Sequence, residues 1–195
     1  MSSVGLRDDT LDRMVRAVEK VRERLLRAAS ALRRAGVDYA IAGGNAVAVW
    51  VAQIDEGAVR NTRDVDLLIR RADLDRARAA LEPAGFHYLN LAGLDLFLDG
   101  VTGSPREAIH ILFAGEMVRP EEPSANPDVT ESQESKDFRV LTLEALIRIK
   151  LTAFRRKDQV HLLDMLELGL IDATWCARLS PILSDRLRLL IENPD

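Results

Sequence analysis

The chain has 195 residues, of which 47% are hydrophobic and 30% charged, and its 27 basic and 31 acidic side chains leave a formal net charge of -4 and a pI near 5.5. This apolar content is ample for a folded core and excludes disorder of the whole chain. The near balance of charge argues against broad non-specific binding of nucleic acid, which requires a positive surface to displace counterions, and leaves room only for a local basic patch.

Cysteine usage and hydropathy point to a cytoplasmic protein. Cys176 is the only cysteine, so the chain forms no internal disulfide and no cysteine-based zinc cluster. The N-terminus carries charge where a signal peptide needs an apolar run, and no uninterrupted apolar stretch approaches the roughly 20 residues of a membrane span. We therefore expect no contact with a membrane.

The first predicted element is an amphipathic helix over residues 10–34, because apolar residues recur there at three- and four-residue spacing and Gly36 follows as a stop. Its many Arg and Glu residues, with opposite charges interleaved along the sequence, indicate a solvated face rather than an RNA-binding surface. We predict three parts: this N-terminal helix within residues 1–36, a core over 37–141 and a helical region over 142–195.

The core is predicted to alternate strands and helices. A buried strand over 37–42 ends at the Gly43-Gly44 turn, and a short apolar helix follows over 45–53. The next predicted elements are a strand over 64–69, a helix over 73–81, strands over 86–89 and 94–98 that form a hairpin at Gly93, and a strand over 107–113.

The last part of the core is predicted to contain a mobile surface loop. Residues at about 116–137 are rich in Pro, Glu and Ser and do not bury enough apolar area to pack, although such loops can close over substrates. A short strand over 138–141 follows, and Thr142 begins a helix. Further helices are expected over roughly 158–168 and 179–191.

Two acids at alternate positions are the most informative feature of the core. Side chains at i and i+2 of a strand project to the same face, so Asp64 and Asp66 lie side by side while Val65 and Leu67 point into the core. Magnesium favours such hard oxygen ligands, usually one or two carboxylates with phosphate oxygens and water. The pattern predicts a magnesium site, against the plainer alternative of a solvated strand end.

The Gly43-Gly44 pair precedes this strand and suits an anion. Glycines allow backbone amides to approach a phosphate, and the free N–H groups and dipole of the helix that follows favour negative charge. A phosphate cradle beside a magnesium site implies a nucleoside triphosphate as the ligand.

These motifs resemble the nucleotidyltransferase superfamily, which has a Gly-Gly or Gly-Ser turn followed by an Asp-x-Asp strand. The resemblance is carried by residues 41–47 and 61–67, extends to residues 143–158 and covers roughly 35–170. Within the superfamily the chain looks most like the small prokaryotic group that includes the AbiEii-type toxins and the minimal nucleotidyltransferases. The resemblance implies an α/β (α+β) fold, with a mixed sheet flanked by helices, an N-terminal helix and a C-terminal helical extension.

The resemblance also implies roles for particular residues. Gly43, Gly44 and the start of the next helix at Asn45 would hold the triphosphate, Asp64 and Asp66 would hold Mg²⁺ or Mn²⁺, and Lys150 would approach the phosphates. The implied activity is transfer of a nucleoside monophosphate from a magnesium-bound NTP to an acceptor RNA, protein or small molecule. An antitoxin or a second copy of the chain is the implied protein partner.

Two basic residues near these motifs are open to more than one interpretation. Arg63 is placed either to touch phosphate or to brace Asp66 or the loop. Lys157 is predicted to share a helical stripe with Lys150 and to join a polar cluster with Asp158 and His161 facing the cleft. The alternatives are surface ion pairs and a histidine satisfied within the structure.

The sequence departs from the family pattern at His110, which occupies the position of the expected third carboxylate. A neutral imidazole serves as a general base near pH 7 but is a poor magnesium ligand. His110 is therefore either a catalytic base or the mark of a degenerate member that binds nucleotide or a partner without turnover, as in a toxin–antitoxin system. Asp95 and Asp99 are the better placed substitute acids, since Glu107 has the opposite parity to His110 on a regular strand.

Overall fold

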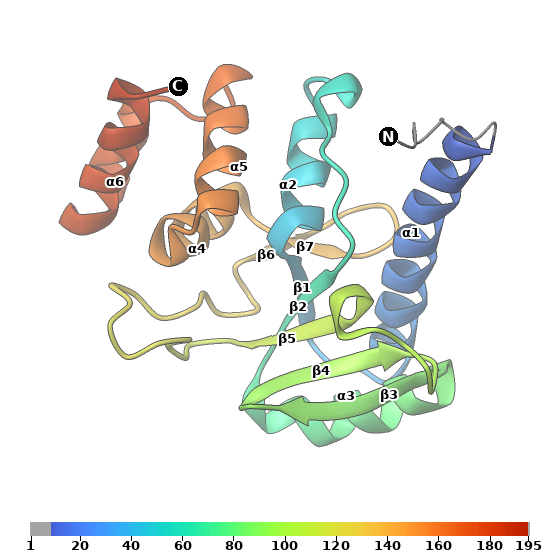
Figure 1. Ribbon diagram of the computed structural model, residues 1–195. Helices are drawn as coiled ribbons and strands as arrows, with labels where there is room; N and C mark the ends of the chain where they lie inside the picture. Colours follow the sequence, from blue (N-terminus) through green and yellow to red (C-terminus); the bar gives the residue numbers. More distant parts are fainter. Residues whose placement is uncertain (1–8, 195) are drawn as a thin grey trace, which may run out of the picture.

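The computed structural model describes residues 9–194 and has a mixed α/β fold with a seven-stranded sheet (Figure 1). Helices α1, α2 and α3 pack on the strands, and α4, α5 and α6 form the C-terminal helical part. The helices are α1 (Thr10–Arg34), α2 (Gly43–Ala52), α3 (Leu74–Leu81), α4 (Leu143–Ala153), α5 (Arg156–Glu167) and α6 (Pro181–Glu192). The strands are β1 (Tyr39–Ala42), β2 (Val65–Ile69), β3 (Phe86–Leu91), β4 (Leu94–Asp99), β5 (Ile109–Phe113), β6 (Ser132–Glu134) and β7 (Arg139–Leu141).

Strand β2 lies at the centre of the sheet, whose order is β3-β4-β5-β2-β1-β7-β6. It runs antiparallel to β1 and parallel to β5, and Val65, Leu67, Leu68 and Ile69 are fully buried. Helix α2 packs against β1 and β2 and also contacts α4 and α5. Asp64, the residue directly before β2, therefore lies next to the C-terminal helices.

The predicted elements are observed at nearly the predicted positions. Helix α1 spans the residues expected, and the side chain of Thr142 caps α4 by accepting a hydrogen bond from the amide of Ala145. Helix α2 begins at Gly43 rather than at Asn45, so the glycine pair forms its first turn. The division of the chain into three parts stays a prediction.

The loop prediction is wrong for part of its range. Residues Ser132–Glu134 form edge strand β6, and Val129 is buried in the core. The Asn126 side chain also donates to the carbonyl of Phe113. Backbone pairing between β6 and β7 and these local hydrogen bonds order this segment, although its few apolar side chains would not do so by burial alone.

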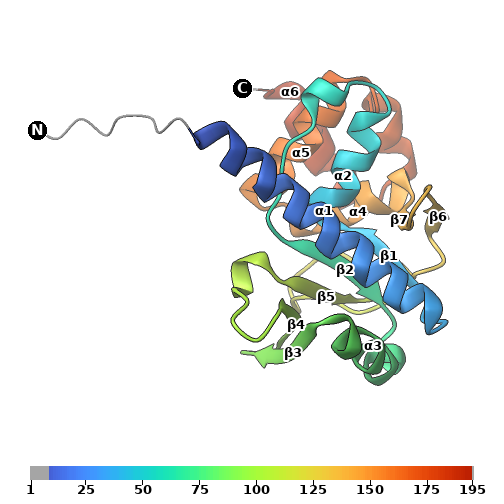
Figure 2. The ribbon, with the colours of Figure 1, turned by 90° about the vertical axis from the view of Figure 1, so that its right-hand side faces the viewer.

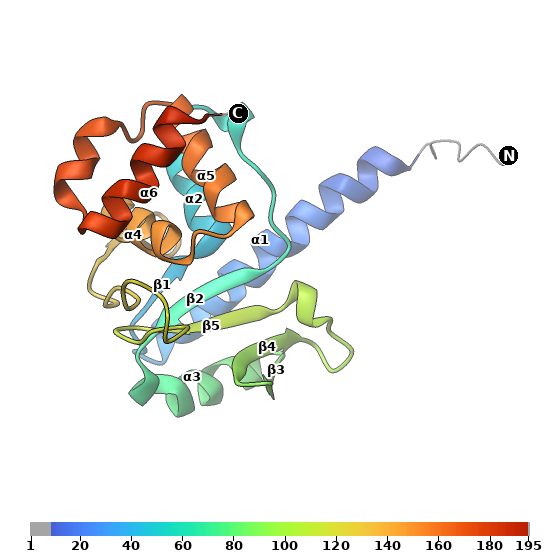
Figure 3. The same ribbon diagram turned by 60° about the vertical axis from the view of Figure 1, so that its left-hand side comes forward.

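Helix α1 is packed only along its C-terminal half. Its buried residues begin at Arg24, whereas the first half is exposed and projects beyond the rest of the molecule (Figures 2 and 3). Arg24 is 4% exposed and donates to Asp99 and, at 2.9 Å, to the carbonyl oxygen of Arg63, while Arg27 also pairs with Asp99. Polar contacts with the hairpin and with the start of β2 therefore set the direction of this helix. Among the described residues, no helix combines the length and the apolar character needed to cross a membrane.

Asp99→Ala is expected to lower the free energy of unfolding by about 2 kcal/mol, because it leaves the buried guanidinium of Arg24 without its carboxylate. Asp9→Ala is the control, since Asp9 also pairs with an arginine but both partners are about half exposed, and we expect a change within about 0.5 kcal/mol. Urea denaturation measures both variants, and equal losses would contradict the anchoring role of Asp99.

Candidate functional site

A cleft of about 320 Å³ lies between the sheet and the C-terminal helices. The sheet side carries Gly43, Asp64, Asp66 and His110. The other side is formed by the segment after β5 and by the junction of α4 and α5, with the cations Arg119, Lys150, Arg155 and Lys157 and the acids Glu122 and Asp158. Cations outnumber acids on this side and face Asp64 and Asp66 on the other, which makes the cleft suitable for a metal-bound polyphosphate.

Gly43 makes the closest backbone approach in the site. Its φ is +62°, and a Cβ built there would lie 1.7 Å from Oδ2 of Asp66. Ala42 pairs directly with Asp66 in the β1–β2 register, which brings the strand end against the carboxylate. Only glycine satisfies both the backbone conformation and the space that Asp66 occupies. The first turn of α2 carries no acidic side chain, so its N–H groups remain suited to an anion.

Asp64 is held in place from both of its flanks. The Thr62 hydroxyl donates to Oδ1 of Asp64 at 2.5 Å, and the Asn45 side chain donates to the Asp64 carbonyl at 2.8 Å. Lys157 Nζ lies 4.0 Å from Oδ2. Burial alone would raise the pKa of Asp64, but Thr62 and Lys157 hold this pKa below its usual value. The carboxylate is therefore charged, and it stays 28% exposed to a ligand.

Asp66 is the more desolvated acid of the pair. Burial and then the negative charge of Asp64 raise the pKa of Asp66, so the two neighbouring carboxylates titrate in opposite directions. The positive charge of a divalent cation between them would offset both causes of the raised pKa, because it favours the ionised form of each carboxylate. Within residues 9–194, no three His, Cys, Asp or Glu side chains gather closely enough to hold a metal ion by themselves. Two carboxylates completed by phosphate and water fit magnesium, which does not require a full protein cage.

His110 lies beside Asp66, as the sequence pattern predicted. The parallel register of β2 and β5 pairs the two residues directly, so both side chains leave the same face of the sheet. Nε2 of His110 lies 3.1 Å from the carbonyl oxygen of Pro105, which can only accept, so Nε2 carries the proton. Nδ1 is then the ring nitrogen that can gain or lose a proton.

Asp95 and Asp99, the acids predicted as substitutes, do not lie where a third carboxylate would stand. Asp95 lines the cleft but accepts hydrogen bonds from Tyr88 and Asn90, and Asp99 is paired with the arginines of α1. The register pairs Leu96 with His110, so Asp95 and Asp99 have the wrong parity. Glu107 lines a different hollow.

Lys150 lines the cleft, but its charge is already neutralised. It is 3% exposed, and its Nζ donates to Asp158 at 2.7 Å, while Arg155 donates to the other oxygen of the same carboxylate. Burial lowers the pKa of Lys150; it opposes ionisation of Asp158 too, but Lys150 and Arg155 still hold the Asp158 pKa low. This buried cluster shapes the cleft wall as much as it supplies charge.

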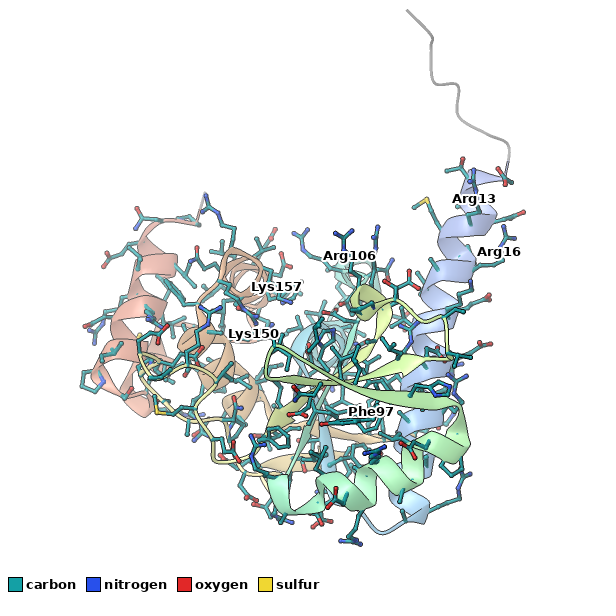
Figure 4. The ribbon with its side chains drawn as sticks, turned by 60° about the horizontal axis from the view of Figure 1, so that its bottom comes forward. Arg13, Arg16, Phe97, Arg106, Lys150 and Lys157 are labelled. Atoms are coloured by element: carbon teal, nitrogen blue, oxygen red, sulfur yellow. The ribbon has the colours of Figure 1, made fainter. Side chains whose placement is uncertain are left out.

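The prediction that Lys150 and Lys157 share one helical stripe is wrong. Phe154 has a φ of +47° and ends α4, and α5 begins at Arg156, so the two lysines come from successive helices (Figure 4). Both still line the same cleft. Lys157 is about half exposed and is the cation that faces Asp64.

The remaining predicted residues lie at the edges of the site or outside it. Arg63 is exposed and lines a separate hollow beside α1, and the contact that supports β2 comes from its backbone carbonyl. His161 lies one turn beyond Asp158, and its Nδ1 is buried without a hydrogen-bond partner among the described residues. Burial and the charge of Lys150 lower the pKa of His161 to about 4, so it is neutral near pH 7. Arg119 and Arg155 also line the cleft but were not among the predicted site residues. Arg119 lies in the segment expected to be a mobile loop, and Arg155 lies in a segment similar to the family without a role assigned to it.

A comparison with known proteins identifies the fold. No family model and no curated protein matches the sequence. Among solved structures, the chain is similar to an antigenic nucleotidyltransferase-like protein from Paracoccidioides brasiliensis, with a TM-score of 0.59 and 18% identity over 92% of this chain and 91% of that one. The chain has a nucleotidyltransferase-like fold.

Two other solved structures match at lower TM-scores. ANT(2″)-Ia in complex with adenylyl-2″-tobramycin gives 0.48 at 14% identity over 93% of this chain and 98% of that one. JHP933 from Helicobacter pylori gives 0.47 at 16% identity over 98% of this chain and 78% of that one. At these identities the comparisons speak for the fold alone.

Gly43→Ala in this nucleotidyltransferase-like core is expected to destabilise the protein by roughly 1–3 kcal/mol more than Gly115→Ala. Both glycines have positive φ, but a Cβ at Gly115 would meet nothing within 4 Å, so the difference isolates the contact with Asp66. Chemical denaturation of the two variants provides the measurement. Equal losses would show that the close approach at Gly43 carries no cost.

Asp66→Asn is expected to stabilise the metal-free protein by on the order of 1 kcal/mol near pH 7, because it removes a desolvated charge beside Asp64. A raised pKa means that the ionised form weakens the native state, so wild type loses stability as the pH rises through the folded pKa of Asp66. The advantage of the variant should therefore vanish at acid pH. Thermal unfolding in chelator across pH tests this, and a variant less stable at every pH would contradict it.

Proposed function

We propose that the protein is a metal-dependent nucleotidyltransferase that moves a nucleoside monophosphate from an NTP to an acceptor. One observation carries the proposal: Asp64 and Asp66 line one cleft, with Asp66 against the Gly43 backbone, and cations outnumber acids on the opposite side of that cleft. The nucleotidyltransferase-like fold supports it. The acceptor classes compatible with this site are RNA, protein and small molecules that present a hydroxyl or a phosphate.

Asp64 and Asp66 would hold Mg²⁺ or Mn²⁺, because both carboxylates line the cleft and the lowered pKa of Asp64 keeps that carboxylate charged. A bound divalent ion would stabilise charge on the attacking oxygen and on the leaving pyrophosphate in an in-line displacement. Thr62 and Asn45 keep Asp64 oriented before any ligand binds. Asp64 is thus already oriented in the folded protein, so ligand binding requires little rearrangement of this carboxylate.

The triphosphate would lie along the cationic wall of the cleft. Gly43 and Gly44 leave the first amides of α2 open to an anion, and Lys157 supplies a mobile charge next to Asp64. Arg119 and Arg155 extend the positive wall away from the acids. Lys150 contributes mainly through Asp158, whose second oxygen orients Arg155.

His110 would accept the proton of the acceptor hydroxyl. Its Nε2–H is committed to the Pro105 carbonyl, which fixes the tautomer and leaves Nδ1 as the base. Its place beside Asp66 puts this base on the face of the sheet that carries the two acids.

A second candidate function is nucleotide or partner binding without turnover, as in one component of a toxin–antitoxin pair. The observation that favours it is His110, since the described residues provide no third carboxylate beside Asp64 and Asp66. In this case a nucleotide with magnesium would raise the melting temperature through mass action, but no acceptor would be labelled.

The test incubates the protein with α-labelled NTPs, magnesium and a cell extract. We expect an acceptor to become labelled and Asp64→Asn to lower labelling at least about 100-fold, because the variant removes a metal ligand. Asp185→Asn, on α6, is the matched control, since Asp185 is exposed and pairs only with Arg188.

Three outcomes separate the two functions. Equal labelling by wild type and Asp64→Asn contradicts the enzymatic proposal. A ligand-dependent rise in melting temperature without labelling by wild type supports the binding function, and labelling gained by His110→Asp would strengthen it. Lys157→Ala is preferable to a Lys150 variant for testing phosphate contacts, because loss of Lys150 would leave Asp158 buried and unpaired.

A further inference from the structure

A stripe of cations runs along one side of α1 and does not belong to the cleft. Its members recur at three- and four-residue spacing and therefore share one face of the helix: Arg13, Arg16, Lys20, Arg24 and Arg27. The acids Asp12, Glu19 and Glu23 form a neighbouring stripe. Opposite charges that are interleaved along the sequence are thus separated on the surface of the helix, whose first half is exposed to solvent as expected.

The two halves of this stripe have different surroundings. Arg24 and Arg27 pair with Asp99 and fix the helix to the body. Arg16 and Lys20 make no ion pair with any residue in 9–194, and Arg13 pairs only with the exposed Asp9. The anchored half therefore holds the unpaired half out in a set direction (Figures 2 and 3).

The projecting N-terminal half of α1 lines a hollow of about 610 Å³, next to residues 61–63, which lead into β2. Its cations are Arg13, Arg16, Lys20, Arg24 and Arg63, and its one acid is Glu107. Arg63 makes no side-chain ion pair within the described part of the chain. None of the acids of the α1 stripe lines this hollow. Arg24 and Arg13 are paired with Asp99 and Asp9, but Arg16, Lys20 and Arg63 make no ion pair within residues 9–194. This concave surface has only one acid of its own, so it attracts an anion although the whole chain is acidic.

The hollow adjoins the candidate active site through the residues that support its acids. Thr62 lines the hollow and donates to Asp64, which lines the cleft. Pro105 accepts from His110, and the next residue, Arg106, is exposed on the same short turn. Figure 4 shows Arg106 between Lys157 on one side and Arg13 and Arg16 on the other. In this view, Arg106 stands between the cations of the cleft and those of the projecting helix.

We propose that this hollow and the free half of α1 bind the phosphate backbone of a single-stranded polynucleotide, whose end is thereby presented to Asp64, Asp66 and His110. Arg13 to Lys20 span about 10 Å of helix, enough to meet about three successive phosphates of one strand. Met14, Ala17 and Val21 line the same hollow and offer apolar surface to the bases. The inference rests on the proposed function and names its acceptor class.

A polynucleotide fits this surface better than an acidic peptide. The proposed reaction needs an acceptor hydroxyl at the acids of β2, and a strand end provides that hydroxyl next to a regular row of phosphates. An acidic peptide supplies the charge but no hydroxyl at a fixed place relative to it. Guanidinium groups, four of the five cations here, also suit phosphate oxygens through paired hydrogen bonds.

The experiment measures binding of a labelled single-stranded RNA by fluorescence anisotropy over a range of salt concentrations. Arg16→Glu with Lys20→Glu is expected to weaken binding at least about tenfold, and Arg16→Gln with Lys20→Gln is expected to lower the slope of log K against log salt by about 2. Both sites are exposed and unpaired, so the fold should be unaffected, as thermal unfolding will verify. Arg34→Glu with Lys136→Glu is the control, because it changes the net charge equally at exposed sites outside the hollow.

Each outcome has a definite consequence. Binding reduced by the α1 pair and not by the control pair supports the proposal. Equal binding by all variants, no binding of RNA, or binding of a poly-glutamate peptide in place of RNA overturns it. If RNA binding fails while an NTP with magnesium still raises the melting temperature, only this inference is lost; if RNA binding follows the stripe but no labelling occurs, only the proposed transfer is lost.

Discussion

The contact between the Gly43 backbone and the Asp66 carboxylate is the constraint on which the rest of the site depends. It requires a residue without Cβ and with positive φ at the end of β1, and it follows from the pairing of Ala42 with Asp66. The same contact starts α2 beside the acids and desolvates Asp66. The helix end and the carboxylate that we propose to bind phosphate and metal are thus both consequences of one strand register.

The charged side chains around this contact range from a buried ion pair to exposed cations. The buried pair of Lys150 and Asp158 is neutral as a unit and orients Arg155, so it gives the cleft a firm wall. Lys157, on the following helix, is half exposed and free to exchange Asp64 for a phosphate. Beyond the cleft, α1 carries its own cations, whose direction is set by Arg24 and Asp99. An acidic protein can therefore carry two local clusters of cations, one at the cleft and one on α1.

Local pattern was sufficient to predict most of the fold and the centre of the site. Alternation in β2 placed Asp64 and Asp66 on one face, whereas the position of His110 came from the family resemblance and its register with Asp66 from the structure. Two successive helices were predicted here, but the positive φ of Phe154 between them was not predictable, since a bulky residue rarely adopts it. Strand β6 has a polar sequence and exists only because β7 offers it an edge. The cations Arg119 and Arg155 are brought to the cleft by tertiary structure alone.

The central claim is that Asp64 and Asp66 together hold a divalent ion that carries a polyphosphate. Crystals grown with Mn²⁺ and a non-hydrolysable NTP test it directly, because anomalous scattering locates the metal. We expect a Mn²⁺ peak within bonding distance of both carboxylates and of phosphate oxygens, with the phosphates at the start of α2. A nucleotide bound elsewhere, or one bound in the cleft with no metal on these two acids, would contradict the account.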